Sequence, residues 1–266
     1  MTLYSHQYLN IQYIVIQKTK KFLFQEPLME GVILERKNRF IMKVMVNNKI
    51  ETCHCPTTGR VGNIVFKNVP CLLAINSNTK TKYTVEAVSL SSPEICEKKW
   101  IGINQVKANR YVKFFLETNQ MPRMVKINKN SIISRERLIG KSRLDFLIDE
   151  DVRLEVKTPL VMLPLRDNYV TNENVEFRKN EKFTSFDRFF KHLEDLTISS
   201  LDKHRSIMVT FYMFEAAPFI PPKVAKDSEI LRRIDRGLKS GVEMWQVNCK
   251  FDKDGMELVD YYEMFR

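Results

Sequence analysis

Short hydrophobic segments between about Leu28 and Leu90 show the alternating pattern of β-strands. In one of them Phe40, Met42, Val44 and Val46 would share one face, because successive side chains of an extended chain point to opposite sides. The Asn47-Asn48 pair that follows tolerates the positive φ angles of a tight hairpin. The pattern predicts strands at Leu28–Leu34, Phe40–Val46, Ile50–His54, Cys71–Ile75 and Tyr83–Val88.

The remainder of the chain alternates between helical and extended patterns. Apolar residues at helical spacing predict amphipathic helices at Asn109–Glu117, Ser185–Leu196 and Asp227–Gly241. The segments around these helices predict strands at Ile132–Ile139, Arg143–Ile148, Val152–Thr158, Ser206–Phe214, Met244–Phe251 and Glu257–Tyr262. Helices and strands interleaved in this way are typical of a mixed α/β domain.

The length and the change of pattern indicate two domains. A chain of 266 residues is long for one domain, and Pro93 with a cluster of charges interrupts the strand pattern at Ser91–Lys99. We therefore predict domains at residues 1–95 and 96–266. The first resembles an OB-like small β-barrel, and the element order of the second matches the restriction-endonuclease-like, or PD-(D/E)xK, core. The expected fold class is α/β with an all-β N-terminal part.

Charge and composition narrow the range of partners. The chain has 43 Lys and Arg against 32 Asp and Glu, a net charge of +11, which attracts polyanions and favours DNA or RNA as partner. Lysine enrichment for solubility would give the same charge. Five cysteines without paired spacing favour reduced thiols and a cytoplasmic protein. We recognise no secretory signal, membrane span or nucleotide-binding fingerprint, so neither a membrane nor a small-molecule cofactor is expected, and a homodimer is left open.

Candidate catalytic residues lie on three consecutive predicted strands of the second domain. Asp145 lies on the middle strand, and Glu155 and Lys157 lie two residues apart on the next, so these two share a sheet face. Carboxylates here could bind Mg²⁺ or Mn²⁺, with Lys157 orienting a water or stabilising phosphate charge. Glu136, on the preceding strand, would be a third carboxylate ligand. The alternative is a solvated sheet face on which Glu155 and Lys157 form a surface ion pair.

Several segments stand in a fixed order along the chain: His54–Arg60, Trp100–Asn104 with Asn109–Arg110, Ser142–Leu147 with Glu155–Lys157, Arg188 with Lys191–Leu193, and Gly241–Glu243. Together they resemble the sugar fermentation stimulation protein family, SfsA. The first resembles the family's barrel loop, the second its segment after the barrel, and the third its nuclease-like signature. The last two resemble its later helices. The resemblance extends from about residue 30 to the C-terminus.

The resemblance implies an N-terminal OB-like domain, a C-terminal PD-(D/E)xK nuclease-like domain and DNA binding. It also implies a link to the regulation of sugar (maltose) metabolism. Three features depart from the family pattern. Asp167–Lys182 forms a long polar insertion, Phe186–Phe189 keeps Arg188 but lacks the family's glycine, and the first 25 or so residues have no recognised counterpart.

Five residues are predicted to contact nucleic acid. Arg39 and Arg60 flank the barrel segments, Arg143 neighbours the acidic residues, and Arg188 and His192 are four apart on one helical face. The last pair would equally fit a packed or solvent-facing position. The first functional hypothesis is a nucleic-acid-binding protein with a divalent-metal-dependent phosphodiesterase (nuclease) site. The second is a non-catalytic DNA-binding protein or transcriptional regulator.

Overall fold

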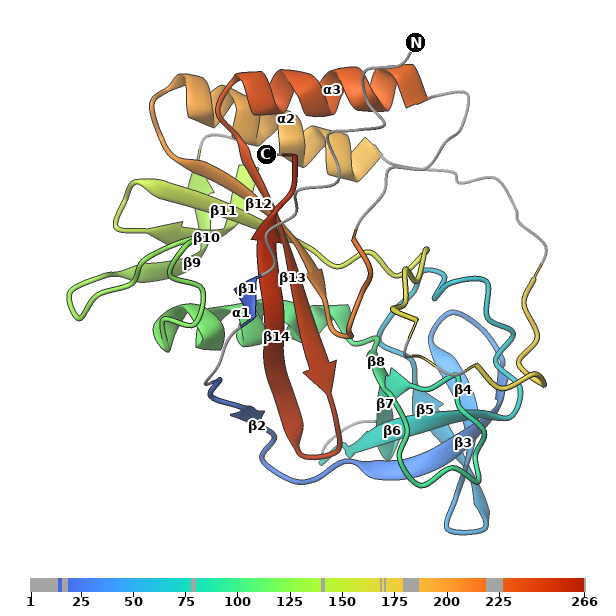
Figure 1. Cartoon of the computed structure of the whole chain (residues 1–266). Coiled ribbons are helices and arrows are strands. Elements are labelled where there is room, and N and C mark those ends of the chain that lie inside the picture. Colours follow the sequence, from blue (N-terminus) through green and yellow to red (C-terminus); the bar gives the residue numbers. More distant parts are fainter. Residues whose placement is uncertain are drawn as a thin grey trace.

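Two β-sheets organise the protein (Figure 1). The computed structural model describes residues 14–15, 19–77, 80–139, 142–167, 169, 171–178, 187–218 and 227–265. The first sheet contains β3 (Met29–Arg36), β4 (Ile41–Val46), β5 (Lys49–His54), β6 (Val69–Ile75), β7 (Tyr83–Val88) and β8 (Ile101–Gly102). The five strands predicted for the N-terminal region are confirmed.

The first sheet closes into the expected OB-like barrel. Its strand order is β5-β4-β3-β6-β7-β8, and β5 also pairs with β7 in parallel. The hairpin between β4 and β5 turns at Asn47 and Asn48, with φ angles of 47° and 60°. Met42, Val44 and Val46 fill the barrel, as their spacing predicts. Phe40 does not join them, because it lies ahead of β4 and its side chain is 49% exposed.

The second sheet is mixed, as the sequence predicts. It is built from β9 (Ile133–Ile139), β10 (Ser142–Ile148), β11 (Val152–Lys157), β12 (Ser206–Tyr212), β13 (Glu243–Phe251) and β14 (Gly255–Glu263). β11, β12 and β13 run parallel to one another, whereas the other neighbouring strands are antiparallel. Parallel neighbours need long crossovers, and each crossover here contains a helix.

Helices cover both faces of the second sheet (Figure 1). α1 (Ala108–Glu117) buries Tyr111 and Phe115 in a core with the β12 and β13 side chains of one face. α2 (Asp187–Leu201) and α3 (Asp227–Lys239) cover part of the other face, where Leu193 and Ile234 pack with Met208. Among the described residues, none of the helices has the length and apolar character that crossing a membrane requires.

The N-terminal strands lie along the second sheet. β1 (Ile14–Val15) and β2 (Phe22–Leu23) both pair with β14 in antiparallel register. The sequence-based division groups residues 1–95 together. The pairing instead shows that this early segment contributes to the sheet of the C-terminal domain.

Residues 159–178, which we call the strap, run from β11 along the barrel; 168 and 170 are outside the described residues. Two barrel residues donate backbone hydrogen bonds to the strap. Gly62 N donates to Leu160 O at 2.6 Å, and Val65 N donates to Glu176 O at 2.8 Å. The strap bonds to the second domain through Ala217 N and Pro164 O (2.6 Å). The strap, whose second half overlaps the predicted polar insertion, therefore bonds to both domains.

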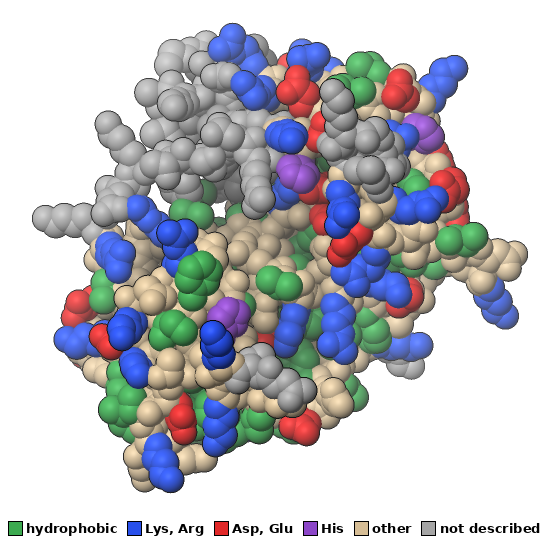
Figure 2. All heavy atoms as spheres, turned by 180° about the vertical axis from the view of Figure 1, so that it is seen from behind, with side chains coloured by type: hydrophobic (Ala, Val, Ile, Leu, Met, Phe, Trp, Pro, Cys, Tyr) green, Lys and Arg blue, Asp and Glu red, His purple; other side chains and the backbone are tan. Residues whose placement is uncertain are grey.

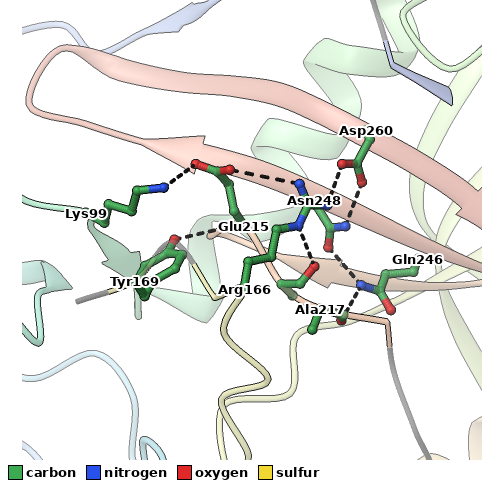
Figure 3. Close-up of polar contacts among 9 residues, drawn as sticks. Lys99, Arg166, Tyr169, Glu215, Ala217, Gln246, Asn248 and Asp260 are labelled. Carbon is green, nitrogen blue, oxygen red and sulfur yellow. Dashed lines mark hydrogen bonds and ion pairs between the residues drawn. The ribbon is translucent and has the colours of Figure 1, made fainter. Parts of the chain in front are cut away.

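A buried polar network holds the strap in place (Figure 3). Arg166 of the strap pairs through Nη2 with Asp260 Oδ2 of β14 at 2.5 Å, and its Nε donates to the backbone oxygen of Ala216. Asp260 is 3% exposed, and its other oxygen accepts from Asn248 Nδ2 at 2.7 Å. Asn248 in turn accepts from Gln246. Since a buried carboxylate is costly without partners, Asp260 depends on the guanidinium.

We expect Arg166→Ala to lower the free energy of unfolding by about 3 kcal/mol, because it leaves the Asp260 carboxylate buried without its cation. Lys67→Ala is the matched control, a barrel residue that pairs with the same strap. Lys67 lies 3.9 Å from Glu176 with both side chains more than half exposed, so its loss should cost below about 1 kcal/mol. Urea unfolding measures both. Equal losses of unfolding free energy in Arg166→Ala and Lys67→Ala would show that the network contributes no more to stability than a surface ion pair.

Candidate active site

The candidate site lies where β10 and β11 separate. Their paired residues run from Ile148 and Val152 to Phe146 and Leu154, and the regular pairing ends there. Beyond that point Asp145 Oδ2 accepts a hydrogen bond from the backbone N–H of Val156 at 2.8 Å. The carboxylate of Asp145 thus takes the position of a backbone acceptor, which fixes it against β11.

A helix holds the second oxygen of Asp145. Asn109, in the first turn of α1, donates from Nδ2 to Asp145 Oδ1 at 2.7 Å. Each carboxylate oxygen offers two lone-pair directions, so both keep the capacity to bind a further partner. The orientation of the carboxylate is therefore set by protein donors while it remains able to ligate a cation.

Glu155 is the most buried charged residue of the site. Its neighbours Leu154 and Val156 lie in the α1-side core, so the alternation of β11 turns Glu155 and Lys157 to the other face, as predicted. Glu155 Oε1 lies 2.6 Å from Lys157 Nζ and 2.5 Å from His192 Nδ1. Its Oε2 atom is buried and has no hydrogen-bond partner among the described residues. One oxygen is thus held by two nitrogens and the other is left without a donor.

Burial controls the protonation of Glu155. It raises the pKa of this carboxyl to about 7, and the negative charge of Asp145 acts in the same direction. Lys157 opposes both effects through its charge and its hydrogen bond. The pair of carboxylates therefore favours a bound proton or cation at neutral pH.

Glu136 is not brought into this cluster. Its backbone has a φ of +53°, and its side chain is 56% exposed and lies 3.4 Å from Arg143 Nη1. Arg143 is itself 68% exposed. The two residues pair with each other at the edge of the sheet. Within the described ranges, no three Asp, Glu, His or Cys residues are grouped as a metal site, and Glu136 adds no third carboxylate beside Asp145 and Glu155.

A polar row extends from the site across the sheet. Lys157 lies opposite Thr210 of β12, and Thr210 lies opposite Gln246 of β13. Thr210 is 6% exposed and Gln246 is fully buried. Gln246 belongs to the network of Figure 3, so the candidate site and the strap junction share one sheet face.

The remaining predicted contacts lie on the barrel and on α2. Arg39 and Arg60 are exposed on the barrel, and the Arg39 guanidinium lies 5.6 Å from the centroid of the Phe40 ring. In Figure 2, Lys and Arg side chains surround exposed hydrophobic side chains at the lower left, where the barrel lies. His192 reaches Glu155, whereas the side chain of Arg188 lies outside the described residues.

Sequence reasoning missed Arg36 and the role of Asn109. Arg36 donates to the backbone oxygens of Thr57 (2.7 Å), Gly59 (3.0 Å) and Arg39 (3.2 Å). It therefore joins the turn that carries Arg39 to the loop that carries Arg60. The available signal for Asn109 was its place as a polar residue in the first turn of an amphipathic helix. Its partner, 36 positions away, could not be read from the sequence.

The fold and the site define a class of two-domain proteins in which an OB-like barrel precedes a mixed α/β domain. Residues 34–103 match the family model of the SfsA N-terminal OB domain. The chain is 28% identical to a sugar fermentation stimulation protein homolog of Picosynechococcus over 244 residues, covering 88% of this chain and 89% of that protein. A homolog from Bartonella quintana is 27% identical, covering 88% and 95%.

A solved structure has the same fold. It is described as Pyrococcus furiosus SfsA in complex with Ca²⁺, and it superposes with a TM-score of 0.69 at 20% identity, covering 93% of this chain and 98% of that one. The chain is therefore similar over most of its length to the sugar fermentation stimulation protein family, SfsA, and its barrel matches that family's N-terminal OB domain.

The raised pKa of Glu155 predicts an unusual dependence of stability on pH. The folded state holds this proton up to about pH 7, whereas the unfolded carboxyl releases it near its ordinary pKa of 4.5. In EDTA, the wild-type protein should therefore gain stability as pH falls from about 7 towards 4.5. At pH 8, Glu155→Gln should be more stable than wild type by on the order of 1 to 3 kcal/mol, and the difference should vanish near pH 4.5.

Urea unfolding across this pH range measures the effect. Added Mg²⁺ provides the matched test, because a cation bound at the carboxylates should raise the unfolding midpoint of wild type and not that of Glu155→Gln. If the free energy of unfolding changed with pH in the same way for wild type and Glu155→Gln, the raised pKa of Glu155 would be contradicted.

Proposed function

We propose that the protein binds nucleic acid and cleaves its phosphodiester backbone with the help of a divalent cation. The observation that carries the proposal is the convergence of Asp145, Glu155 and Lys157 where β10 and β11 separate. A lysine beside two carboxylates, next to strands that no longer pair, is the arrangement that a PD-(D/E)xK nuclease would need. The net charge of +11 and the OB-like barrel support a polyanionic substrate.

The donor set suits a hard cation. Asp145 and Glu155 supply carboxylate oxygens, and Glu155 Oε2 is a buried oxygen without a donor among the described residues. Mg²⁺ and Mn²⁺ favour such oxygens and are commonly held by one or two carboxylates, with waters and substrate phosphates completing the coordination. A family member is described in complex with Ca²⁺, another cation that prefers oxygen ligands. When bound, the cation would supply Lewis-acid stabilisation of the phosphate and a more acidic water.

Side chains of the protein would stabilise charge, orient the carboxylates and bind the substrate. Lys157, whose side chain is 23% exposed, can turn its ammonium from Glu155 towards the phosphate charge or an attacking water. His192 holds Glu155 from the α2 side and keeps its orientation fixed. Asn109 does the same for Asp145. The barrel would hold the polynucleotide through Arg39 and Arg60, with Phe40 offering an exposed ring for base stacking.

Cleavage assays test the proposal. Purified protein is incubated with labelled single-stranded DNA, duplex DNA, RNA and an RNA–DNA hybrid, in Mg²⁺, Mn²⁺ or EDTA. We expect cleavage of at least one substrate that requires the cation. Glu155→Ala and Lys157→Ala should each lower the rate by roughly 100-fold or more, since each removes charge stabilisation from the reacting centre.

Glu117→Ala is the control for these variants. Glu117 lies at the exposed end of α1 and pairs with Lys113, so its removal takes away a carboxylate far from the site. Its activity should equal that of wild type. The nuclease proposal fails if wild-type protein cleaves no form of nucleic acid with either cation.

A non-catalytic DNA-binding protein or regulator is the second candidate, favoured by the barrel and the net charge alone. It predicts tight binding with no cleavage. A link to sugar metabolism would then belong to the genes bound. Both candidates require the barrel to bind nucleic acid, which can be measured in EDTA without any reaction.

The barrel contacts can be separated by their salt dependence. Arg39→Ala and Arg60→Ala should each reduce the slope of log affinity against log salt by about 0.7 for single-stranded DNA, because each phosphate contact releases counterions. Phe40→Ala should weaken binding by about 1 to 3 kcal/mol without changing the slope, because stacking releases none. Lys250→Ala, an exposed cation on β13, is the control and should change neither. Fluorescence anisotropy titrations at several salt concentrations distinguish these outcomes. If the slope is unchanged in both arginine variants, Arg39 and Arg60 do not contact phosphate.

A further inference from the structure

Residues 104–109, which we call the connector, join the barrel to both strands of the candidate site. The connector contains the 3-10 turn Gln105–Lys107 and the first residues of α1. Four of its side chains, those of Asn104, Gln105, Lys107 and Asn109, contact the barrel or the two site-bearing strands. The sequence singled out Trp100–Asn104 and Asn109–Arg110 as family-like, but the proposed chemistry uses only Asn109 from them.

The barrel end of the connector is fixed by a buried carboxylate. Glu86 of β7 is 2% exposed, and it accepts from Asn104 Nδ2 at 3.0 Å and 3.1 Å through its two oxygens. Lys107 Nζ lies 2.7 Å from the same group. Moving the connector away from the barrel would leave the Glu86 charge buried and unpaired, so the connector moves with the barrel.

Gln105 bridges the barrel loop and the end of β11. Its Oε1 atom accepts from Thr57 Oγ1 at 2.8 Å, and its Nε2 atom donates to the backbone oxygen of Thr158 at 2.5 Å. Thr57 is 1% exposed and belongs to the loop that ends at Arg60. Thr158 directly follows Lys157. One amide therefore spans the distance between a predicted phosphate-binding loop and the strand that carries the lysine.

The far end of the connector reaches the other strand. Asn109 donates to Asp145, so the same short segment bonds to the ends of β10 and β11 where they separate. Two further bonds act alongside it. Arg36 fixes the backbone of the Thr57–Arg60 loop, and Gly62 bonds to Leu160 beyond Thr158. The loop and the two site-bearing strands are thus held in one frame with Gln105 at its centre.

We propose that Gln105 is a positioning residue that aligns the end of β11, with Glu155 and Lys157, to nucleic acid held by the Thr57–Arg60 loop. The inference rests on the proposed function and specifies how its two parts work together. A phosphate backbone bound at the loop then favours one arrangement of β11. A cation bound at the carboxylates favours the same arrangement. The two ligands bind cooperatively, and by linkage each strengthens the other by the same factor.

The chemistry of the bridge explains the choice of glutamine. The position needs an acceptor for a hydroxyl and a donor to a carbonyl on one side chain, which an amide provides and a carboxylate or a hydrocarbon does not. Thr57 allows a matched pair of substitutions. Thr57→Val keeps the shape and loses the hydroxyl, whereas Thr57→Ser keeps the hydroxyl and loses a methyl group.

The test measures coupling between two ligands. Affinity of the full chain for a labelled single-stranded DNA of about 16 nucleotides is measured by anisotropy in EDTA and in saturating Ca²⁺. For wild type we expect Ca²⁺ to tighten binding by at least about fivefold, within the usual range for coupled sites. In Gln105→Leu this tightening factor should fall to about one, while affinity in EDTA stays within about twofold of wild type. In Thr57→Val the tightening by Ca²⁺, measured against that variant's own affinity in EDTA, should also fall to about one. Thr57→Ser should keep the wild-type factor.

The outcomes separate this inference from the proposed nuclease function. A purely structural role would lower the unfolding midpoint of Gln105→Leu and leave the Ca²⁺ factor unchanged, which would overturn the inference, as would the absence of coupling in wild type. If coupling depends on Gln105 but no nucleic acid is cleaved in Mg²⁺ or Mn²⁺, the inference stands and the nuclease proposal fails. Cleavage by Gln105→Leu at the wild-type kcat, with an unchanged coupling factor, would support the nuclease proposal and overturn the inference.

Discussion

The buried carboxylate of Glu155 is the constraint on which the arrangement of the C-terminal domain depends. At 2% exposure it is tolerable only with close partners, and these come from Lys157 on its own strand and His192 on α2. α2 must therefore lie over β11, which the parallel crossover to β12 achieves. Asp145 adds a second negative charge nearby, and its two oxygens are fixed by α1 and by the β11 backbone. Helices on opposite faces of one sheet thus hold two carboxylates together at the point where two strands separate.

The sequence predicted those parts of the site that follow from local geometry. A period of two residues places Glu155 and Lys157 on one face whatever the tertiary fold. The four-residue spacing on α2 predicted His192 as a phosphate contact or a packed residue, and the structure pairs it with Glu155. Glu136 was assigned from its place on the preceding strand, yet its φ of +53° interrupts regular strand geometry and its side chain pairs with Arg143. The prediction that Phe40 shares a face with Met42, Val44 and Val46 was wrong for a similar reason, because Phe40 precedes the regular part of β4. Asn109 and Gln105 could not be assigned, since their partners lie on elements whose packing no local pattern specifies.

The strap shows how a segment that looks like an insertion can join two domains. Its second half overlaps the polar insertion predicted at Asp167–Lys182, and there Glu176 forms an exposed pair with Lys67. Arg166 instead pairs with the buried Asp260, and Tyr169 accepts from the backbone of Glu215, so polar residues make the junction rigid (Figure 3). Composition alone cannot distinguish a solvated polar side chain from one paired inside. The consequence is that the barrel and the α/β domain share bonds through the strap on one side and the connector on the other.

A conflict of charge explains why such rigid coupling would matter for the proposed function. The chain as a whole is basic and attracts a phosphate backbone, but the two carboxylates of the site repel it. A divalent cation at Asp145 and Glu155 would neutralise the two carboxylates, and in its absence the raised pKa of Glu155 achieves part of the same neutralisation with a proton. Under this proposal a polynucleotide held on the barrel would reach the site only when this charge is compensated. If the loop and β11 could move independently, the backbone would turn away from the carboxylates at little cost. Because Gln105 and the strap bond the loop and β11 into one frame, binding on the barrel would place phosphate charge beside the site, and that charge would in turn favour occupancy by the cation.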